Sequence, residues 1–160
     1  MNSSPLWMGV FLYLAEQVKD MYRVAVVTGG SRGIGAACVE KFAAEGYCVV
    51  FFSRAETQAA QGLVRRLQAQ GLNVRHMVCD VSDGAAVAEA FRQIDRLYHR
   101  VDVLVNNAGI SLIRQFQDTA AEDWRKLFSV NTDGVYHCIQ SALPLMLRRQ
   151  KGAVVNVASM

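Results

Sequence analysis

Three glycines stand where a dinucleotide could be held. Gly29, Gly33 and Gly35 follow the β-branched run at residues 24–27 with the spacing Gly-x-x-x-Gly-x-Gly, and a helix-patterned segment follows over residues 33–45. Glycine lets the backbone approach a pyrophosphate closely, and the free amides of a helix N-terminus attract its negative charge. A glycine-rich turn alone is equally well a plain tight turn, but this one lies between a strand and a helix, which favours a dinucleotide site.

A basic residue follows the second apolar run, at residues 48–52. In a dinucleotide fold an acidic side chain near this point selects NAD, whereas an arginine accommodates the additional phosphate of NADP. The residues here are Ser53 and Arg54, and Arg32 lies in the glycine turn on the same side. Two guanidinium groups could converge on one phosphate, the alternative being two solvated loop arginines. The pattern therefore favours NADP(H) as cofactor, without a metal.

The elements that must position these residues alternate along the chain. Apolar runs predict strands, and apolar residues at helical spacing predict helices between them. The expected strands are residues 24–27, 48–52, 74–78, 103–105 and 153–157; the expected helices are 33–45, 56–70, one capped by Ser82 or Asp83, and 122–149, interrupted at 131–134 and at Pro144. Successive strand–helix–strand units imply parallel pairing with right-handed crossovers, and strands apolar on both faces imply helices on both sides. We expect an α/β fold, a Rossmann-like doubly wound parallel sheet.

Length and composition limit the other possibilities. The 160 residues, 52% of them hydrophobic, suffice for one core and are too few for two comfortable domains. We expect residues 1–20 to be an extension outside the fold and residues 21–160 to form the NADP(H)-binding domain. The apolar stretch at residues 6–15 is shorter than the roughly 20 residues of a membrane span, so a membrane anchor is the less favoured alternative. The net charge of +3 is dispersed, without the dense basic run of a nucleic-acid groove.

The four cysteines indicate neither zinc nor disulfides. They lie far apart, without a Cys-x-x-Cys pair or a histidine at ligand spacing: Cys38, Cys48, Cys79 and Cys138. We expect reduced, buried thiols in a cytoplasmic protein.

Four segments resemble motifs of the short-chain dehydrogenase/reductase family. Residues 28–35, Thr-Gly-Gly-Ser-Arg-Gly-Ile-Gly, resemble its cofactor motif, and residues 106–109, Asn-Asn-Ala-Gly, its signature after the fourth strand. Asn131 is similar to its helix asparagine, and residues 155–159, Val-Asn-Val-Ala-Ser, to the strand that delivers its serine. The motifs follow the family order. Within the family, the glycine loop and Arg54 are most similar to 3-oxoacyl-(acyl-carrier-protein) reductases of fatty-acid biosynthesis, which implies NADPH-dependent reduction of a carbonyl group.

The resemblance implies a role for each matching position. Asp80 and Val81 would hold the adenine ring, Asn107 would lie beside the cofactor ribose, Asn131 would hold a water of a proton relay, and Ser159 would hydrogen-bond the substrate carbonyl oxygen. Asp80 as a turn cap and Asn107 as a purely structural residue are the alternatives. The cofactor-binding positions implied are Gly29, Ser31, Arg32, Gly33, Ile34, Gly35, Arg54, Asp80, Val81, Asn107, Ala108 and Gly109.

The family's proton donor has no counterpart in these 160 residues. In the family it is a tyrosine in Tyr-x-x-x-Lys, shortly after the serine. None of the five tyrosines here has a lysine four residues later. We therefore expect the N-terminal part of a longer reductase, inactive by itself, with its last strand left as an uncovered edge.

The parent protein is expected to be a homo-oligomer, dimeric or tetrameric, acting on a small-molecule or acyl-carrier-bound carbonyl substrate and not on nucleic acid or membranes. An NADP(H)-binding module without turnover and an oxidative NAD-dependent dehydrogenase are the other hypotheses.

Overall fold

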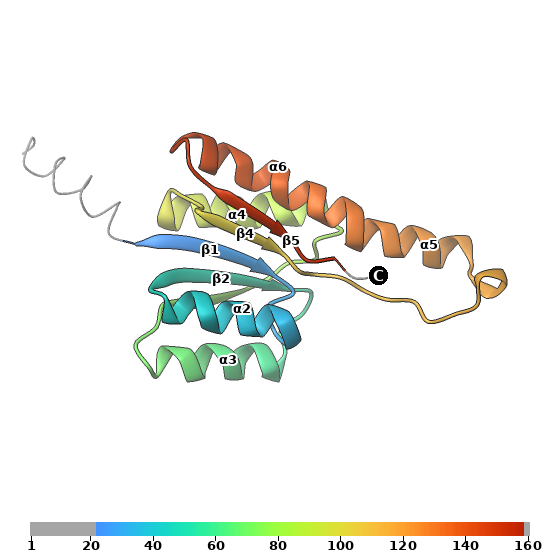
Figure 1. Ribbon diagram of the computed structural model, residues 1–160, viewed down its shortest axis with the longest axis horizontal. Helices are drawn as coiled ribbons and strands as arrows, with labels where there is room; N and C mark the ends of the chain where they lie inside the picture. The colour runs from blue at the N-terminus through green and yellow to red at the C-terminus, as the bar shows by residue number, and fades with distance from the viewer. Residues whose placement is uncertain (1–21, 159–160) are drawn as a thin grey trace, which may run out of the picture.

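The computed structural model describes residues 22–158, which form a five-stranded parallel sheet with helices on both faces (Figure 1). The predicted extension at residues 1–20 and Ser159 lie outside the described residues. The strands are β1 (Arg23–Thr28), β2 (Tyr47–Ser53), β3 (Val74–Val78), β4 (Val103–Asn106) and β5 (Ala153–Asn156). The helical segments are α2 (Gly33–Ala44), α3 (Gln58–Gln68), α4 (Gly84–Tyr98), η1 (Phe116–Asp118), α5 (Ala121–Phe128), η2 (Ser129–Asp133) and α6 (Gly134–Leu147).

The strand order is β3-β2-β1-β4-β5, which confirms the doubly wound fold. The chain builds outward from β1 to β3, then returns to the other side of β1 and continues with β4 and β5. The direction of winding therefore changes between β1 and β4. In open α/β sheets, ligands bind outside the carboxyl ends of the strands at this switch point.

The central strands β1, β2 and β4 are buried on both faces, as predicted, whereas β3 and β5 at the two edges are more exposed. Side chains alternate between faces along a strand, so Phe51 and Phe52 enter different cores although both are fully buried. Phe51 belongs to the core beneath α2 and α3, and Phe52 packs edge-on against Phe91 in the core beneath α4 and α6. Figure 1 shows the two helical layers on opposite sides of the sheet.

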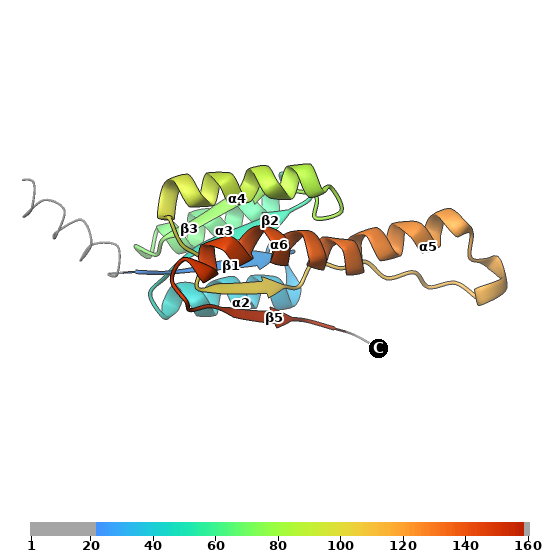
Figure 2. The ribbon, with the colours of Figure 1, turned by 90° about the horizontal axis from the view of Figure 1, so that it is seen from above.

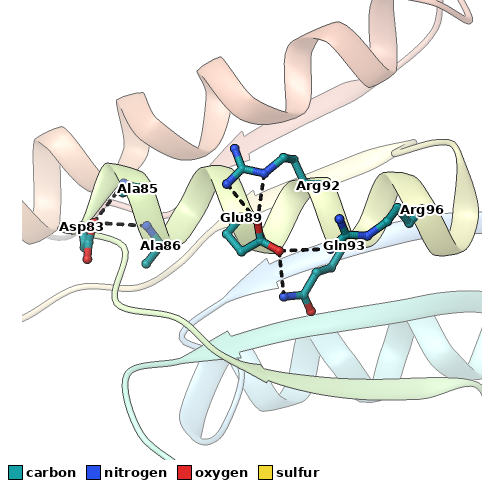
Figure 3. A network of polar contacts seen from close by, with 7 residues as sticks. All are labelled: Asp83, Ala85, Ala86, Glu89, Arg92, Gln93 and Arg96. Carbon is teal, nitrogen blue, oxygen red and sulfur yellow. Dashed lines mark hydrogen bonds and ion pairs between the residues drawn. The ribbon is translucent and has the colours of Figure 1, made fainter.

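Capping side chains fix where two of the helices begin. α3 begins at Gln58, two residues later than predicted, because the Thr57 hydroxyl accepts a hydrogen bond from the Ala60 amide. Of the two predicted caps for α4, Asp83 is the one used: its carboxylate accepts from the amides of Ala85 and Ala86 (Figure 3). Farther along α4, Glu89 binds side chains of the same exposed face, Arg92, Gln93 and Arg96.

The predicted interruptions of the long helix take a different form. Residues 131–134 do not break it: α5, the π-helical turn η2 and α6 follow without a gap (Figure 2). The prediction of an interruption at Pro144 was wrong, because this proline lies inside α6. It costs a hydrogen bond only near the end of the helix, where the buried neighbours Leu145 and Met146 anchor the last turn to the core.

The amino ends of the strands are closed by a buried ion pair. The Arg100 guanidinium donates to both carboxylate oxygens of Asp102, at 2.8 and 2.6 Å, and the Val24 amide donates to Asp102 at 2.7 Å. Burial raises the pKa of Asp102, but the hydrogen bonds from Arg100 and Val24 outweigh it and leave the pKa below its ordinary value. The pair thus ties the start of β1 to the start of β4.

β5 is the last strand in the order of the sheet. It pairs with β4, and each of its four residues is exposed. Within the described part of the chain it is an edge strand, as expected. No helix among residues 22–158 is long and apolar enough to cross a membrane.

All four cysteines are free. Burial, with a smaller contribution from neighbouring Asp80 and Asp83, raises the pKa of Cys79 to about 11. Burial raises the pKa of Cys138 to about 12, with a further contribution from Cys79. Both therefore remain protonated at neutral pH, which makes them unreactive packing residues.

Candidate cofactor site

The glycine turn lies at the carboxyl end of β1, at the switch point. Gly29 and Gly33 have φ angles of +65° and +55°, which favour glycine. A Cβ atom on Gly29 would lie 2.9 Å from the Ala108 Cα, and one on Gly35 would lie 2.3 Å from the Gly29 carbonyl oxygen. A Cβ on Gly33 would meet nothing within 4 Å. Two glycines therefore allow close backbone packing, whereas Gly33 supplies conformation and faces open space.

The N-terminus of α2 is available to an anion. Its N-cap residue, Arg32, has an extended backbone and makes no side-chain capping bond, unlike Thr57 and Asp83 at the starts of α3 and α4. The first amides of a helix have no intrahelical acceptor and carry the positive end of its dipole. Ser31 is half-buried in this turn, and Ile34 is exposed. The turn therefore offers the amides of a helix N-terminus without a side-chain cap, next to the open space at Gly33.

A hydroxyl and an amide side chain hold this turn against the end of β4. The Thr28 hydroxyl oxygen accepts from the amides of Asn107 and Ala108 at 3.0 and 2.9 Å. The Asn107 side chain donates to the carbonyl oxygens of Thr28 and Gly29 at 3.0 and 3.2 Å. Asn107 therefore has a structural role in the described residues. Thr28, buried and central, was not among the predicted site residues, although its position at the end of an apolar strand was a usable signal.

The carboxyl end of β2 lies beside that of β1. Ser53 ends the strand, half-buried, and Arg54 follows it in an exposed turn. Arg32 is exposed as well. The convergence of the two guanidinium groups on one phosphate stays a prediction.

The loop after β3 is fixed by its own turn and by α6. One Asp80 carboxylate oxygen accepts from the amide and the hydroxyl of Ser82, at 3.0 and 2.7 Å, so Asp80 does cap a turn. Val81 is buried, and its carbonyl oxygen lies 3.0 Å from Nδ1 of His137. A Cβ on Gly134 would lie 2.7 Å from the Val81 side chain, so α6 packs tightly on this loop.

Asn131 anchors the segment after β4. It lies in the π-helical turn, accepts a hydrogen bond from the Ile110 amide and donates one to the Ile110 carbonyl oxygen, both at 2.9 Å. Gly109 lies close to it, since a Cβ there would stand 3.4 Å from the Asn131 oxygen. Both ends of the side-chain amide are engaged with backbone, and a role in a water relay stays a prediction.

The candidate residues that the structure describes thus lie mainly in the loops at the carboxyl ends of the strands. Ser159 lies outside the described range. The chain belongs to the short-chain dehydrogenase family: the family model described as short chain dehydrogenase matches residues 23–160.

Individual relatives are similar over most of this chain. A 3-oxoacyl-(acyl-carrier-protein) reductase of Staphylococcus epidermidis is 34% identical over 139 residues, which are 87% of this chain and 57% of the relative. A meso-2,3-butanediol dehydrogenase of Serratia marcescens is 36% identical over 137 residues, 86% of this chain and 53% of the relative. The crystal structure of a metagenomic short-chain oxidoreductase in complex with NADP matches with a TM-score of 0.81 and 32% identity, over 86% of this chain and 62% of that one. The chain spans about half the length of the curated relatives it matches.

Proposed function

We propose that this chain is the cofactor-binding part of an NADPH-dependent carbonyl reductase acting on 3-oxoacyl-type substrates. The observation that carries the proposal is the glycine turn that opens onto the uncapped N-terminus of α2. A pyrophosphate fits there because the amide donors lack side-chain acceptors and the space beside Gly33 is free. The similarity to a reductase and to an NADP complex supports the same assignment.

We assign the discrimination between cofactors to the turn after β2. Neither Ser53 nor Arg54 is acidic, and a guanidinium group binds a phosphate monoester well. In this proposal Arg54 and Arg32 contact the 2′-phosphate, Asp80 and Val81 bound the adenine pocket, and Asn107 lies beside the ribose. The remaining contacts come from backbone of the glycine turn and of residues 108–109.

NADPH, when bound, supplies the hydride that reduces a carbonyl group to an alcohol. Ser159 is proposed to hydrogen-bond the substrate carbonyl oxygen, and Asn131 to support the proton relay while holding the segment at Ile110 in place. The family's tyrosine and lysine do not occur in the 160 residues, so the proton donor of this proposal belongs to a longer protein.

The oligomeric state follows from the same proposal. Large apolar side chains are exposed along α5 and α6, which is typical of a surface that is covered by association: Trp124, Phe128, Tyr136, Leu143 and Leu147. We propose a cytoplasmic homo-oligomer, dimeric or tetrameric, and light scattering of the purified protein would measure its mass.

Cofactor preference is the first test. Titration calorimetry with NADPH and with NADH should give at least a roughly tenfold preference for NADPH, the worth of one good phosphate contact. Arg54→Gln should remove most of that preference and leave NADH binding unchanged. Arg92→Gln, on the exposed face of α4, is the matched control. Equal affinities, or tighter NADH binding, would contradict the NADP(H) assignment.

Catalysis is tested in the protein encoded by the reading frame beyond codon 160. If Tyr-x-x-x-Lys follows, acetoacetyl-coenzyme A should be reduced with NADPH, and Ser159→Ala should lower kcat by about 10²–10³-fold. NADPH binding without any turnover of carbonyl substrates would favour the non-catalytic module instead.

A further inference from the structure

A histidine on β3 is joined to the turn that carries Arg54. Nε2 of His76 lies 2.7 Å from the Ser53 hydroxyl oxygen, and the same oxygen lies 2.9 Å from the Ala55 carbonyl oxygen. A hydroxyl group has one proton, and Ser53 donates it to Ala55, since a carbonyl can only accept. The Ser53 hydroxyl therefore bridges the His76 ring and the Ala55 carbonyl oxygen. These two contacts join β3 to the turn around Arg54.

The other ring nitrogen of His76 faces an acid. Nδ1 lies 3.7 Å from a carboxylate oxygen of Glu56, and the side chain of His76 is only 7% exposed. When both ring nitrogens are protonated, the imidazolium has the Ser53 hydroxyl on one side and the Glu56 carboxylate on the other, with which it forms an ion pair. The ring also lies 5.0 Å from that of Phe51, which holds its plane.

The surroundings of His76 determine the pH at which its second proton binds. Burial lowers the pKa of His76, and the attraction of Glu56 partly opposes this shift. Glu56 and His76 line an open pocket of about 510 Å³ together with Arg65 of α3 and Arg75, whose side chain interacts with Tyr98 of α4. Through this pocket the ring can exchange protons with solvent. His76 is therefore neutral at neutral pH and gains its second proton below its ordinary pKa of 6.5.

We propose that His76 is a positioning residue for cofactor choice, which holds the turn at residues 53–56 in the shape that offers Arg54 to the 2′-phosphate and, when protonated, neutralises Glu56. The proposal rests on the NADP(H) site proposed above. Glu56 stands two residues from Arg54, so its unpaired carboxylate weakens phosphate binding by repulsion. An imidazolium beside it offsets that charge. The preference for NADPH over NADH should therefore increase as pH falls through the pKa of His76. Binding of the 2′-phosphate should in turn raise that pKa.

The phosphate itself complicates a simple pH profile. A phosphate monoester has its second pKa near 6, so the ligand loses charge over the same pH range. A comparison between variants removes this contribution, because every variant binds the same ligand.

Two substitutions separate positioning from titration. His76→Gln retains an amide donor toward Ser53 but cannot be protonated, and His76→Leu removes both properties. NADPH and NADH affinities would be measured calorimetrically from pH 5.5 to pH 8. At pH 8 we expect the NADPH:NADH preference of His76→Gln to match the wild type within about twofold, and that of His76→Leu to fall about tenfold, as for one lost hydrogen bond. NADH affinity should not change. His99→Asn, an exposed histidine at the end of α4, is the matched control.

At pH 5.5 the wild type should retain a preference several-fold above that of His76→Gln. As an independent readout, the His76 pKa would be followed by proton NMR, and adenosine 2′,5′-bisphosphate should raise it. The NMR measurement needs no variant, so it stands if His76→Leu fails to fold.

Each contrary result removes a defined part of the proposal. An unchanged preference in His76→Leu, or equal losses of NADH and NADPH affinity, would overturn the positioning role. Parallel pH profiles for the wild type and His76→Gln, with an NMR pKa unmoved by the bisphosphate, would overturn the proton linkage. If Arg54→Gln leaves the preference intact, the NADP(H) site itself is wrong, which is distinguishable from a failure at His76.

Discussion

The two ends of the parallel sheet are held by different chemistry. At the amino ends, the charged pair of Arg100 and Asp102 is buried and tied to the backbone of Val24. At the carboxyl ends, the neutral side chains of Thr28 and Asn107 hold the glycine turn. The first arrangement pairs two charged groups with each other, whereas the second fixes the backbone with uncharged groups alone.

This difference assigns different tasks to the two ends. A carboxylate at the carboxyl ends could compete with a cofactor phosphate for the amides of α2, whereas the Thr28 hydroxyl and the Asn107 amide leave the positive end of the helix dipole uncompensated. At the amino ends no such restriction applies, and the pair can secure the strands. Substitutions at the amino ends should therefore change stability, and those at the carboxyl ends should change binding as well.

The largest expected effect is at the amino ends. Asp102→Ala leaves the buried Arg100 guanidinium and the Val24 amide without this acceptor, and should lower the free energy of unfolding by about 3–5 kcal/mol. Urea denaturation would measure it. Glu89→Ala removes the exposed network of α4 and should leave the denaturation midpoint unchanged, because solvent screens that network. Folded Asp102→Ala should bind NADPH as the wild type does; weakened binding would break the division between the two ends.

The contribution of Asp102 should also depend on pH. Its pKa is lowered in the folded state, so the carboxylate stabilises the fold above its ordinary pKa of about 3.9. That stabilisation is lost as pH falls through the lower, folded-state pKa. The difference in stability between wild type and Asp102→Ala should therefore shrink below about pH 4, measured by denaturation at a series of pH values. A constant difference down to pH 2 would show that the ionisation of Asp102 is irrelevant.

Gly35→Val tests the close packing at the carboxyl ends. Its Cβ would collide with the Gly29 carbonyl oxygen and the Asn107 amide, so the turn must shift. We expect loss of calorimetric NADPH binding and a stability loss of about 1–3 kcal/mol, since an overpacked site distorts its surroundings. Gly62→Ala, inside α3 with open space around it, should be as stable as the wild type or more so. Normal NADPH binding by Gly35→Val would contradict the site.

Thr28→Val should separate hydrogen bonding from shape. It keeps the volume of the side chain but leaves the amides of Asn107 and Ala108 without their acceptor, at a cost of about 1–3 kcal/mol of stability. NADPH binding should weaken at the same time. Thr28→Ser keeps the hydroxyl and drops the methyl group. If the two variants bind NADPH equally well, the hydroxyl does not position the turn.

The smallest effect is expected at the cap of α4. Asp83→Ala removes the acceptor of two amides and should cost about 1 kcal/mol in thermal or urea denaturation. α2 has no such side-chain cap, so Arg32→Ala should leave stability nearly unchanged and weaken NADPH binding. The opposite pattern would mean that Arg32 serves the helix and not a ligand.

Local chemistry predicted most of the framework. The β-branched runs and the glycines gave the order and type of the elements, because a strand buried on both faces must be apolar throughout and a turn with positive φ favours glycine. Helix boundaries were less accurate: Thr57 decides the start of α3 through a hydrogen bond that composition alone does not define. Pro144 was misjudged because tertiary burial of its neighbours outweighs its local preference.

By itself, the sequence determined the alternation of strands and helices, the glycine turn and the absence of an acid at residues 53 and 54, since these depend on residue type and spacing. Only the tertiary structure decided which side chains meet. Thr28 and Asn107 are 79 residues apart, Ser53 and His76 are 23 apart, and Val24 and Asp102 are 78 apart. These hydrogen bonds exist because strand order places the ends of different strands side by side, and no local pattern encodes that order.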